Sequence, residues 1–370
     1  NFLGFDMMST WRVLFNMGWG VALLGLTAGH GSLVIPPARN NYGQKDPANT
    51  TGNPHSNQGP CVGGACLWFS EGCFLGCQTC SATMPNGGNQ LNKPNCTDFV
   101  PNTPQLPEEY RTYNIHNLSE SGDFTRYHPW RSPGRAPISD PCGVAGAYLT
   151  PTGGGGETPE GAHQGDRGSN LPPTRIQTNW IAGKTAEVGW MIAANHGGGY
   201  SYSLCPKTQP LTEECLNKMT LKFADENHTI RYLDEKPSIR IPARDVSIGT
   251  FPEGSTWRLN PIPPCSCDWG RGCKVNGTQP VSRAYRECMD CNLSECGKRV
   301  GTEWPLPFPY GYGQQIWNRE RPSPTADDWV IVDSVQVPTA PGAYVLRWRW
   351  DTEQNPQVWT HCADITIVSA

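Results

Sequence analysis

The sequence of 370 residues predicts an all-β protein, an antiparallel β-sandwich with long, disulfide-stapled loops. Three observations lead to this fold class. The segments that show periodicity alternate apolar and polar residues with period two, and no long amphipathic helix or internal repeat is present. The 41 Gly, 35 Pro and 16 Cys suit many short strands joined by loops.

The clearest strand is predicted for the segment GAYVLRWRWD. One face would carry Tyr344, Leu346, Trp348 and Trp350, and the other Val345, Arg347, Arg349 and Asp351. This alternation is typical of a half-buried strand. Further strands are predicted at Arg175–Trp180, Ala186–Ala193, Tyr200–Leu204, Met219–Phe223, Trp257–Leu259, Trp329–Val337 and Val358–Val368.

A secretory signal peptide is predicted before His30. The stretch from Met8 has a basic residue at Arg12, then an apolar run, and small residues at Thr27 and Gly29 in the cleavage positions. The alternative is an uncleaved membrane anchor, but glycines interrupt an apolar run that is too short to span a bilayer. We therefore expect a secreted, extracellular protein that has no membrane attachment after processing.

This leader sets the predicted domain organisation. Residues 1–29 are upstream residues and signal peptide, and residues 30–370 form a single sandwich domain. Two cysteine-rich loop insertions are expected near residues 55–100 and 262–300. Both contain a C-x-x-C step, which could close a zinc site, but an oxidising compartment favours disulfides. Four remaining cysteines are expected to tie loops to the sandwich, with their connectivity open: Cys142, Cys205, Cys215 and Cys362.

Glycosylation sites and charge narrow the class of partner. Six sequons, typical of surface positions in secreted glycoproteins, occur at Asn49, Asn95, Asn117, Asn227, Asn276 and Asn292. The formal net charge of −4 lacks the basic excess that nucleic acids or anionic membranes attract. A neutral polymer or a small molecule is the better candidate partner, and no nucleic acid is expected.

Three positions far apart in the sequence carry the candidate chemistry: His30, His196 and Trp359. Cleavage after Gly29 would make His30 the first residue, so that its amino group and imidazole Nδ1 could chelate a metal. A second imidazole from His196 would complete a planar set of three nitrogens, which favours Cu(II). The glycines that follow His196 allow a sharp turn that leaves the metal open to a substrate.

These residues resemble a known family, the lytic polysaccharide monooxygenases, which are secreted copper enzymes with a "histidine brace". Four pieces carry the resemblance. They are the predicted signal peptide ending directly at His30, the opening HGSLVIPPAR, the segment ANHGGGYSYSLCP around His196, and the final pattern Q-x-W-x-x-C-A-D-I-x-I. Together they span the predicted mature chain from end to end.

The resemblance implies an immunoglobulin- or fibronectin-III-like sandwich and one copper ion held by His30 and His196. Trp359 matches the axial position, where members usually carry Tyr or Phe. It cannot supply a phenolic oxygen, although its ring could shield that side. Gln357 matches a position that hydrogen-bonds the oxygen species at the copper, and Arg39 resembles a position that supports the ligands.

The implied activity is oxidative cleavage of a polysaccharide, most closely chitin or cellulose, by hydroxylation at C1 or C4. The implied partners are the polysaccharide, an external electron donor and O2 or H2O2, with the protein as a monomer. Two alternatives remain open. One is a non-catalytic polysaccharide-binding or copper-binding protein on the same fold, and the other is a structural cell-wall glycoprotein in which the histidines bind nothing.

Overall fold

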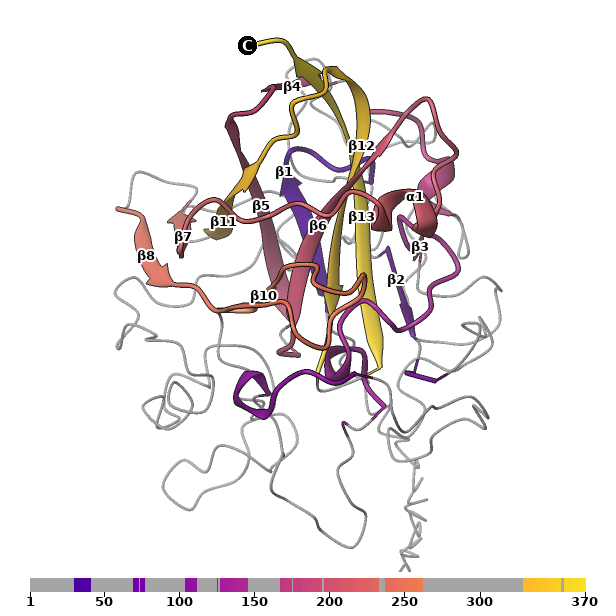
Figure 1. The fold of residues 1–370 in the computed structure, drawn as a ribbon, viewed down its shortest axis with the longest axis vertical. Coiled ribbons are helices and arrows are strands. Elements are labelled where there is room, and N and C mark those ends of the chain that lie inside the picture. Colours follow the sequence, from indigo (N-terminus) through magenta and orange to yellow (C-terminus); the bar gives the residue numbers. More distant parts are fainter. Residues whose placement is uncertain are drawn as a thin grey trace, which may run out of the picture.

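Two β-sheets face each other across a core of aromatic and aliphatic side chains (Figure 1). The computed structural model describes residues 30–40, 69–72, 74–76, 104–111, 125, 127–145, 167–174, 176–194, 196–232, 237–261, 329–353 and 356–370. All structural statements below refer to these residues.

The first sheet has five strands in the order β1-β5-β11-β7-β8. Their bounds are β1 His30–Ile35, β5 Thr185–Ala194, β11 Trp329–Gln336, β7 Asn227–Tyr232 and β8 Ile239–Pro242. Every neighbouring pair in this sheet is antiparallel.

The second sheet has eight strands, of which seven follow the order β3-β2-β13-β12-β6-β10-β9. Their bounds are β3 Val144–Ala145, β2 Phe69–Gly72, β13 Gln357–Val368, β12 Gly342–Asp351, β6 Gly199–Pro206, β10 Trp257–Leu259 and β9 Asp245–Val246. The eighth, β4 (Thr178–Ile181), pairs with the end of β13 in a parallel register. Strand β13 therefore holds β12, β2 and β4 together.

Helical structure in the described residues is limited to short turns. One α-helix, α1, covers Glu213–Asn217, and three 3₁₀ turns occur at η2 Glu108–Tyr110, η3 Pro129–Arg131 and η4 Gly168–Asn170. The Thr212 hydroxyl caps α1 by accepting a hydrogen bond from the Cys215 amide at 3.2 Å. No helix among the described residues is long and apolar enough to cross a membrane.

The predicted all-β, immunoglobulin-like sandwich is confirmed, with β4 as a parallel exception. One predicted strand is wrong. The segment Met219–Phe223 makes only single bridges, from Thr220 to Ser203 and from Phe223 to Val335. The segment passes from β6 to β11: the Leu221 N–H donates to the Tyr202 carbonyl, and the Ala224 N–H donates to the Ser334 carbonyl.

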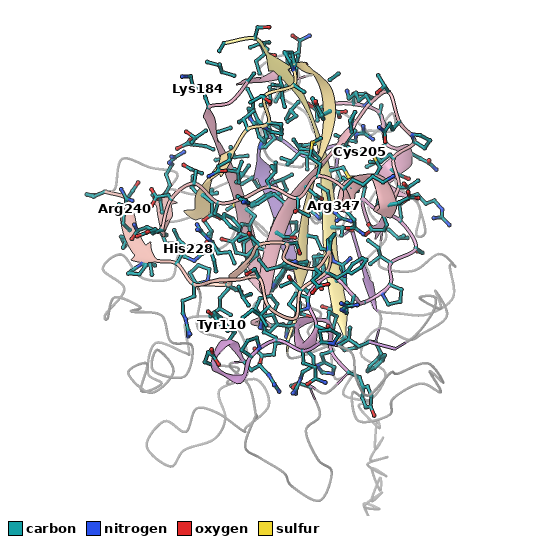
Figure 2. All side chains as sticks on the ribbon, viewed as in Figure 1. Tyr110, Lys184, Cys205, His228, Arg240 and Arg347 are labelled. Carbon is teal, nitrogen blue, oxygen red and sulfur yellow. A yellow bond between two sulfur atoms is a disulfide. The ribbon has the colours of Figure 1, made fainter. Side chains whose placement is uncertain are left out.

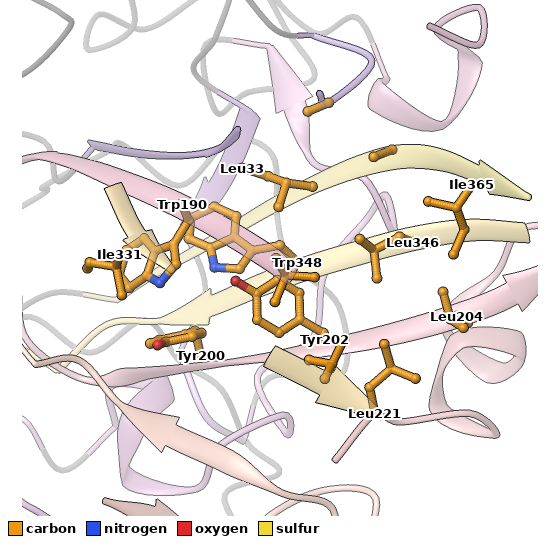
Figure 3. Close-up of a cluster of buried hydrophobic side chains, with 14 of the residues drawn as sticks. Leu33, Trp190, Tyr200, Tyr202, Leu204, Leu221, Ile331, Leu346, Trp348 and Ile365 are labelled. Carbon is orange, nitrogen blue, oxygen red and sulfur yellow. The ribbon is translucent and has the colours of Figure 1, made fainter. Parts of the chain in front are cut away.

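Large aromatic side chains fill the space between the sheets. Trp190 of β5 packs against Trp348 and Trp350 of β12, with ring centroids 5.1 and 5.3 Å apart. Tyr200 and Tyr202 of β6 complete the cluster (Figure 3). Each of these side chains is at most 1% exposed, so they contribute much of the apolar area buried on folding.

The prediction that β12 is half-buried is wrong, because its outer face is buried as well. Arg347, Arg349 and Asp351 point away from the core but are only 0–3% exposed. The carboxylate of Glu213 in α1 pairs with Arg347, and Arg349 forms a two-fold ion pair with Asp351 at 2.7 and 3.2 Å. Burial lowers the pKa of Arg347, and the carboxylate of Glu213 opposes this shift. Figure 2 shows Arg347 beside α1.

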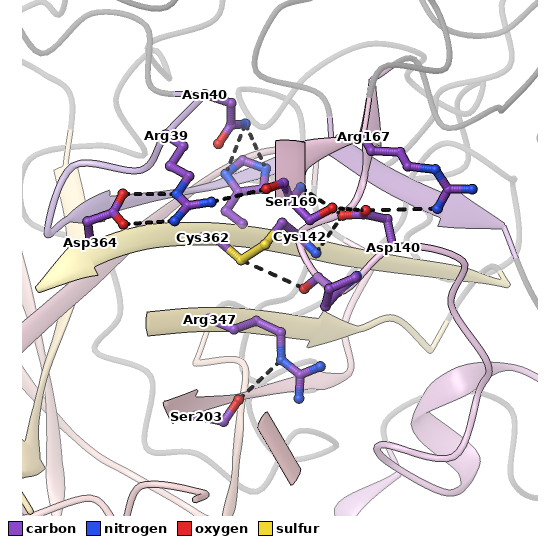
Figure 4. The surroundings of a disulfide bond; sticks show 12 residues. Arg39, Asn40, Asp140, Cys142, Arg167, Ser169, Ser203, Arg347, Cys362 and Asp364 are labelled. Atoms are coloured by element: carbon purple, nitrogen blue, oxygen red, sulfur yellow. Dashed lines mark hydrogen bonds and ion pairs between the residues drawn. A yellow bond between two sulfur atoms is a disulfide. The ribbon is translucent and has the colours of Figure 1, made fainter. Parts of the chain in front are cut away.

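The four cysteines near the strands form two disulfides, as expected. Cys142 pairs with Cys362 of β13, and Cys205 at the end of β6 pairs with Cys215 of α1. The first bridge fixes the loop that carries η4 and β3 against β13 (Figure 4).

Several predictions fall outside the described residues. They include residues 1–29, most of the two cysteine-rich insertions, and all the sequons except Asn227. The side-chain amide nitrogen of Asn227 donates to Asp225 Oδ1 at 3.1 Å. The division into a leader and one domain stays a prediction.

Candidate functional site

His30 and His196 belong to segments that meet at one end of the sandwich. His30 is the first residue of β1, and its Cα pairs with that of Ala194, the last residue of β5. His196 follows two residues later, in the connection to β6, and is 3% exposed. The side chain of His30 lies outside the described part of the structure. The site lies at the end of the sandwich opposite the chain's C-terminus (Figure 1).

The turn after His196 is tightly enclosed. Gly197 and Gly198 have positive φ angles of 64° and 77°, a region that favours glycine. A Cβ on Gly198 would overlap the carbonyl oxygen of Asp351, and one on Gly199 would overlap the ring of Trp130. The glycines are therefore required both by the backbone conformation and by the close approach of β12 and η3.

Trp350 contacts both histidine-bearing segments. Its indole N–H donates to the Gly197 carbonyl at 2.8 Å, which holds the turn after His196. On the other side its ring carbon lies 2.9 Å from where a Cβ of Gly31 would be, so the start of β1 rests directly on the indole. A buried tryptophan of β12 thus sets the spacing between the His30 and His196 backbones.

A second link to His196 comes from the residues that follow β12. The Glu353 N–H donates to the His196 carbonyl at 3.1 Å, and the Glu353 carbonyl lies 2.7 Å from Nδ1 of His128. Because a carbonyl only accepts hydrogen bonds, Nδ1 of His128 carries the hydrogen. His128 precedes η3 and is fully buried.

His128 is a functional candidate that sequence reasoning missed. Burial lowers the pKa of His128 to about 4, and the nearby charge of His196 acts in the same direction. The hydrogen bond to the Glu353 carbonyl opposes this shift. The imidazole is therefore neutral at physiological pH. Its surroundings in the sequence, YHPW, have no periodicity or spacing that could have pointed to it.

Gln357 and Trp359 lie two residues apart at the start of β13, where their side chains share a face. The indole N–H of Trp359 donates to the Gln357 amide oxygen at 3.3 Å, and both side chains are buried. The Thr352 hydroxyl donates to the Gln357 carbonyl at 2.8 Å. Since Thr352 and Glu353 are adjacent, the same short segment connects Gln357 to His128 and His196.

Arg39 lies elsewhere. Its guanidinium forms a two-fold ion pair with Asp364 of β13, at 2.9 and 2.8 Å, and donates to the Ser169 carbonyl (Figure 4). Asp364 is seven residues beyond Gln357 along β13, or roughly 20 Å at the usual rise of a strand. In this structure Arg39 joins the end of β1 to β13.

The donor set suits a cation that prefers nitrogen. The backbone register brings the start of β1 next to His196, and imidazole is a common ligand of copper, zinc and nickel. Among the described side chains, no group of three or more His, Cys, Asp or Glu residues forms a metal site. The sequence predicts that His30 supplies further nitrogens to such a site.

Comparisons with known proteins point to one family. No protein-family model matches the chain. The chain is 24% identical over 203 residues to the AA13 family lytic polysaccharide monooxygenase A of Aspergillus terreus, covering 52% of this chain and 41% of that protein. It is also 24% identical over 206 residues to the lytic polysaccharide monooxygenase aasB of Emericella nidulans, covering 55% of this chain and 52% of that protein. The chain thus spans about half the length of these relatives.

Two solved structures are also similar. One is the AA15 lytic polysaccharide monooxygenase of Thermobia domestica in the Cu(I) state, with a TM-score of 0.24 and 15% identity over 55% of this chain and 77% of that one. The other is the cellulose-active monooxygenase CelS2 in complex with copper, with a TM-score of 0.27 and 11% identity over 92% of this chain and 100% of that one. The sequence comparisons support the resemblance drawn from the four motifs: this chain is similar to the lytic polysaccharide monooxygenases.

Proposed function

We propose that the protein is a secreted, copper-dependent lytic polysaccharide monooxygenase. It would cleave a polysaccharide, chitin or cellulose first among the candidates, by hydroxylation at C1 or C4. The observation that carries this proposal is the approach of the β1 start to the His196 turn, with Trp350 touching both. The sequence similarity to curated monooxygenases supports the same reading.

His30 and His196 are the proposed copper ligands. After cleavage His30 would provide its amino group and one imidazole nitrogen, and His196 the second imidazole. The bound copper would supply one-electron redox chemistry, with electrons from an external donor and with O2 or H2O2 as co-substrate. The Glu353 N–H and the Trp350 indole N–H bind the carbonyls of His196 and Gly197, so the backbone that follows the His196 side chain is held in place.

Gln357 and Trp359 are the proposed groups beside the metal. The hydrogen bond from the Trp359 indole occupies the amide oxygen of Gln357, which turns the amide nitrogen the other way. Gln357 would then act as a hydrogen-bond donor towards an oxygen co-substrate. This arrangement gives the tryptophan a role that the Tyr or Phe usual at this position cannot fill in the same way, because neither has an indole N–H.

His128 would add a neutral imidazole of fixed tautomer near His196. Because its Nδ1 hydrogen is directed to the Glu353 carbonyl, its Nε2 atom is the acceptor. A buried neutral imidazole adds no positive charge that would oppose metal binding at His196.

The test is mass spectrometry of the soluble products from chitin and from cellulose. The processed protein, with His30 confirmed as its first residue, is loaded with copper and supplied with ascorbate. We expect oxidised oligosaccharides from one of the two polymers. Copper binding is measured on the same sample by electron paramagnetic resonance, where a nitrogen-ligated Cu(II) spectrum is expected.

Two variants serve as controls. His196→Ala should abolish both the Cu(II) spectrum and the oxidised products, while circular dichroism checks that the sandwich is retained. His163→Ala removes a histidine from the glycine-rich segment to which the sequence assigns no chemistry, and should change neither. Bound copper without oxidised products on any polysaccharide would instead favour a non-catalytic copper-binding or polysaccharide-binding protein.

A further inference from the structure

The edge of β1 that faces away from β5 is attached to the second sheet through a side chain. In the described part of the chain, β1 is the outermost strand of the five-stranded sheet and pairs with β5 along one edge. Leu33 in the middle of β1 is 0% exposed, so its backbone N–H cannot reach water and needs an acceptor inside the protein. Nδ1 of His361, on β13, lies 3.3 Å from this nitrogen and accepts its hydrogen.

This contact determines the state of the imidazole. A backbone N–H can only donate, so Nδ1 of His361 carries a lone pair, and the ring is neutral with its hydrogen on Nε2. The Ser32 hydroxyl lies 3.3 Å from the same nitrogen, and the side-chain nitrogen of Asn40 lies 3.4 Å from it (Figure 4). These three donors come from β1 and from the residues just after it.

The ring of His361 is packed against β12. His361 is opposite Trp348 in the register of β12 and β13, and the two rings meet edge to face with their centroids 5.4 Å apart. The ring of Trp348 also borders β1, because its Cη2 atom lies 3.0 Å from where a Cβ of Gly31 would be. Residues 31–33 of β1 therefore lie against one buried surface, which Trp348 and His361 form together.

Beyond the end of β1, backbone atoms make the attachment to β13. The Arg39 N–H donates to the Cys362 carbonyl at 2.7 Å. At Leu33 a side chain takes the place of such a backbone bond, because the imidazole of His361 fills the space between the two strands. His361 thus extends the attachment of this segment towards His30, which is three residues before Leu33.

We propose that His361 is a positioning residue for His30. By accepting the hydrogen of Leu33, its neutral imidazole anchors the first half of β1 to β13 and so keeps His30 beside the His196 turn. Without this anchor, an edge strand is free to open locally from one side. The role at a copper ion rests on the function proposed above, whereas the anchor itself does not.

Two substitutions of His361 separate a hydrogen-bonding role from a packing role. His361→Asn places an amide oxygen near the position of Nδ1 but leaves a smaller side chain. His361→Leu fills the space better but offers no acceptor. If His361 only packs, the leucine variant should resemble the wild type more closely than the asparagine variant does. The anchor predicts the reverse order.

Amide hydrogen exchange of the metal-free protein, followed by NMR, measures the anchor. We expect the Leu33 amide to exchange about tenfold faster in His361→Leu, a change on the scale of one hydrogen bond, and to stay close to the wild-type rate in His361→Asn. The amide of Ile331, on a strand that is paired on both sides, is the internal reference and should not change. An unchanged Leu33 rate in His361→Leu, or the same acceleration in both variants, would overturn the proposal.

Copper binding provides the readout of position. Both variants are titrated with Cu(II), and electron paramagnetic resonance records the copper hyperfine splitting. We expect a changed splitting and weaker binding in His361→Leu, and a spectrum like that of the wild type in His361→Asn. Faster exchange at Leu33 without any change in the Cu(II) spectrum would refute the positioning role. A wild type that binds no copper would overturn the function proposed above and with it the role at a metal, while the exchange rates would still decide the anchor.

A measurement on the wild type covers the case in which a variant does not fold. The nitrogen chemical shifts of the His361 ring distinguish a ring nitrogen that carries a hydrogen from one that carries a lone pair. At neutral pH we expect the hydrogen on Nε2 and the lone pair on Nδ1. A hydrogen on Nδ1 would contradict the proposal, because that nitrogen could not accept the hydrogen of Leu33.

Discussion

The hydrogen bond from Trp350 to the turn after His196 can be tested by replacing the indole with a phenyl ring. Trp350→Phe keeps an aromatic side chain between the sheets but removes the N–H that donates to the Gly197 carbonyl at 2.8 Å. Trp348→Phe is the matched control. Trp348 is two residues away on the same face, is also 0% exposed, and its indole nitrogen has no hydrogen-bond partner among the described residues.

The structure allows the size of the effect to be estimated. Both substitutions remove the same part of a fully buried ring, which costs about 1–3 kcal/mol of the free energy of unfolding. Trp350→Phe also leaves a buried carbonyl without this donor, which costs about 1–3 kcal/mol more. We therefore expect Trp350→Phe to be less stable than Trp348→Phe by about 1–3 kcal/mol.

Urea unfolding of the metal-free variants, followed by tryptophan fluorescence and circular dichroism, measures this difference. If the two variants lose the same stability, the hydrogen bond to Gly197 contributes nothing and the reasoning is refuted. A copper titration adds the functional side of the test. Only Trp350→Phe is expected to weaken copper binding, because only Trp350 holds the turn that positions His196.

Three further predictions concern the backbone, the charges and the pH dependence. In urea unfolding, Gly254→Ala should cost about 1 kcal/mol of the free energy of unfolding, and Gly198→Ala several times as much. Both glycines have a positive φ, but only a Cβ at Gly198 would overlap another residue. Glu213→Gln should lower the urea midpoint of unfolding, because a neutral amide replaces the carboxylate that pairs with the buried Arg347. Glu214→Gln should leave the midpoint unchanged, because the Glu214 side chain is 80% exposed. The pKa of His128 falls from 6.5 to about 4 on folding, so below pH 6.5 the unfolded chain binds a proton that the folded chain does not. Stability of the metal-free protein should therefore decrease by about 3 kcal/mol as the pH falls towards 4, and this slope should be missing in His128→Gln.

Much of the fold follows from local patterns in the sequence. The alternation in β12 and the apolar segments of β5, β6, β11 and β13 predicted strands close to those observed. The burial of Arg347 and Arg349 did not follow, because charged residues in alternation normally mark a solvent face. Their partner Glu213 lies on α1, a helix of five residues that is too short to leave a periodic pattern.

The candidate site shows the same division between local and long-range information. The glycines after His196 predicted a tight turn, which the positive φ angles bear out. His128 could not be predicted, because its link to the site runs through the carbonyl of Glu353, 225 residues later in the chain. Backbone hydrogen bonds of this kind place no requirement on the type of the accepting residue.

The connections of β13 also determine when the site can exist during synthesis. The amide of Leu33 on β1 donates to Nδ1 of His361 on β13 at 3.3 Å, across a separation of 328 residues. Gln357 and Trp359 lie on the same strand. Contacts over such separations form slowly, since a long loop must close first. We therefore expect the nascent chain to lack the assembled site until β13 has left the ribosome, so that any copper would be acquired only after that point.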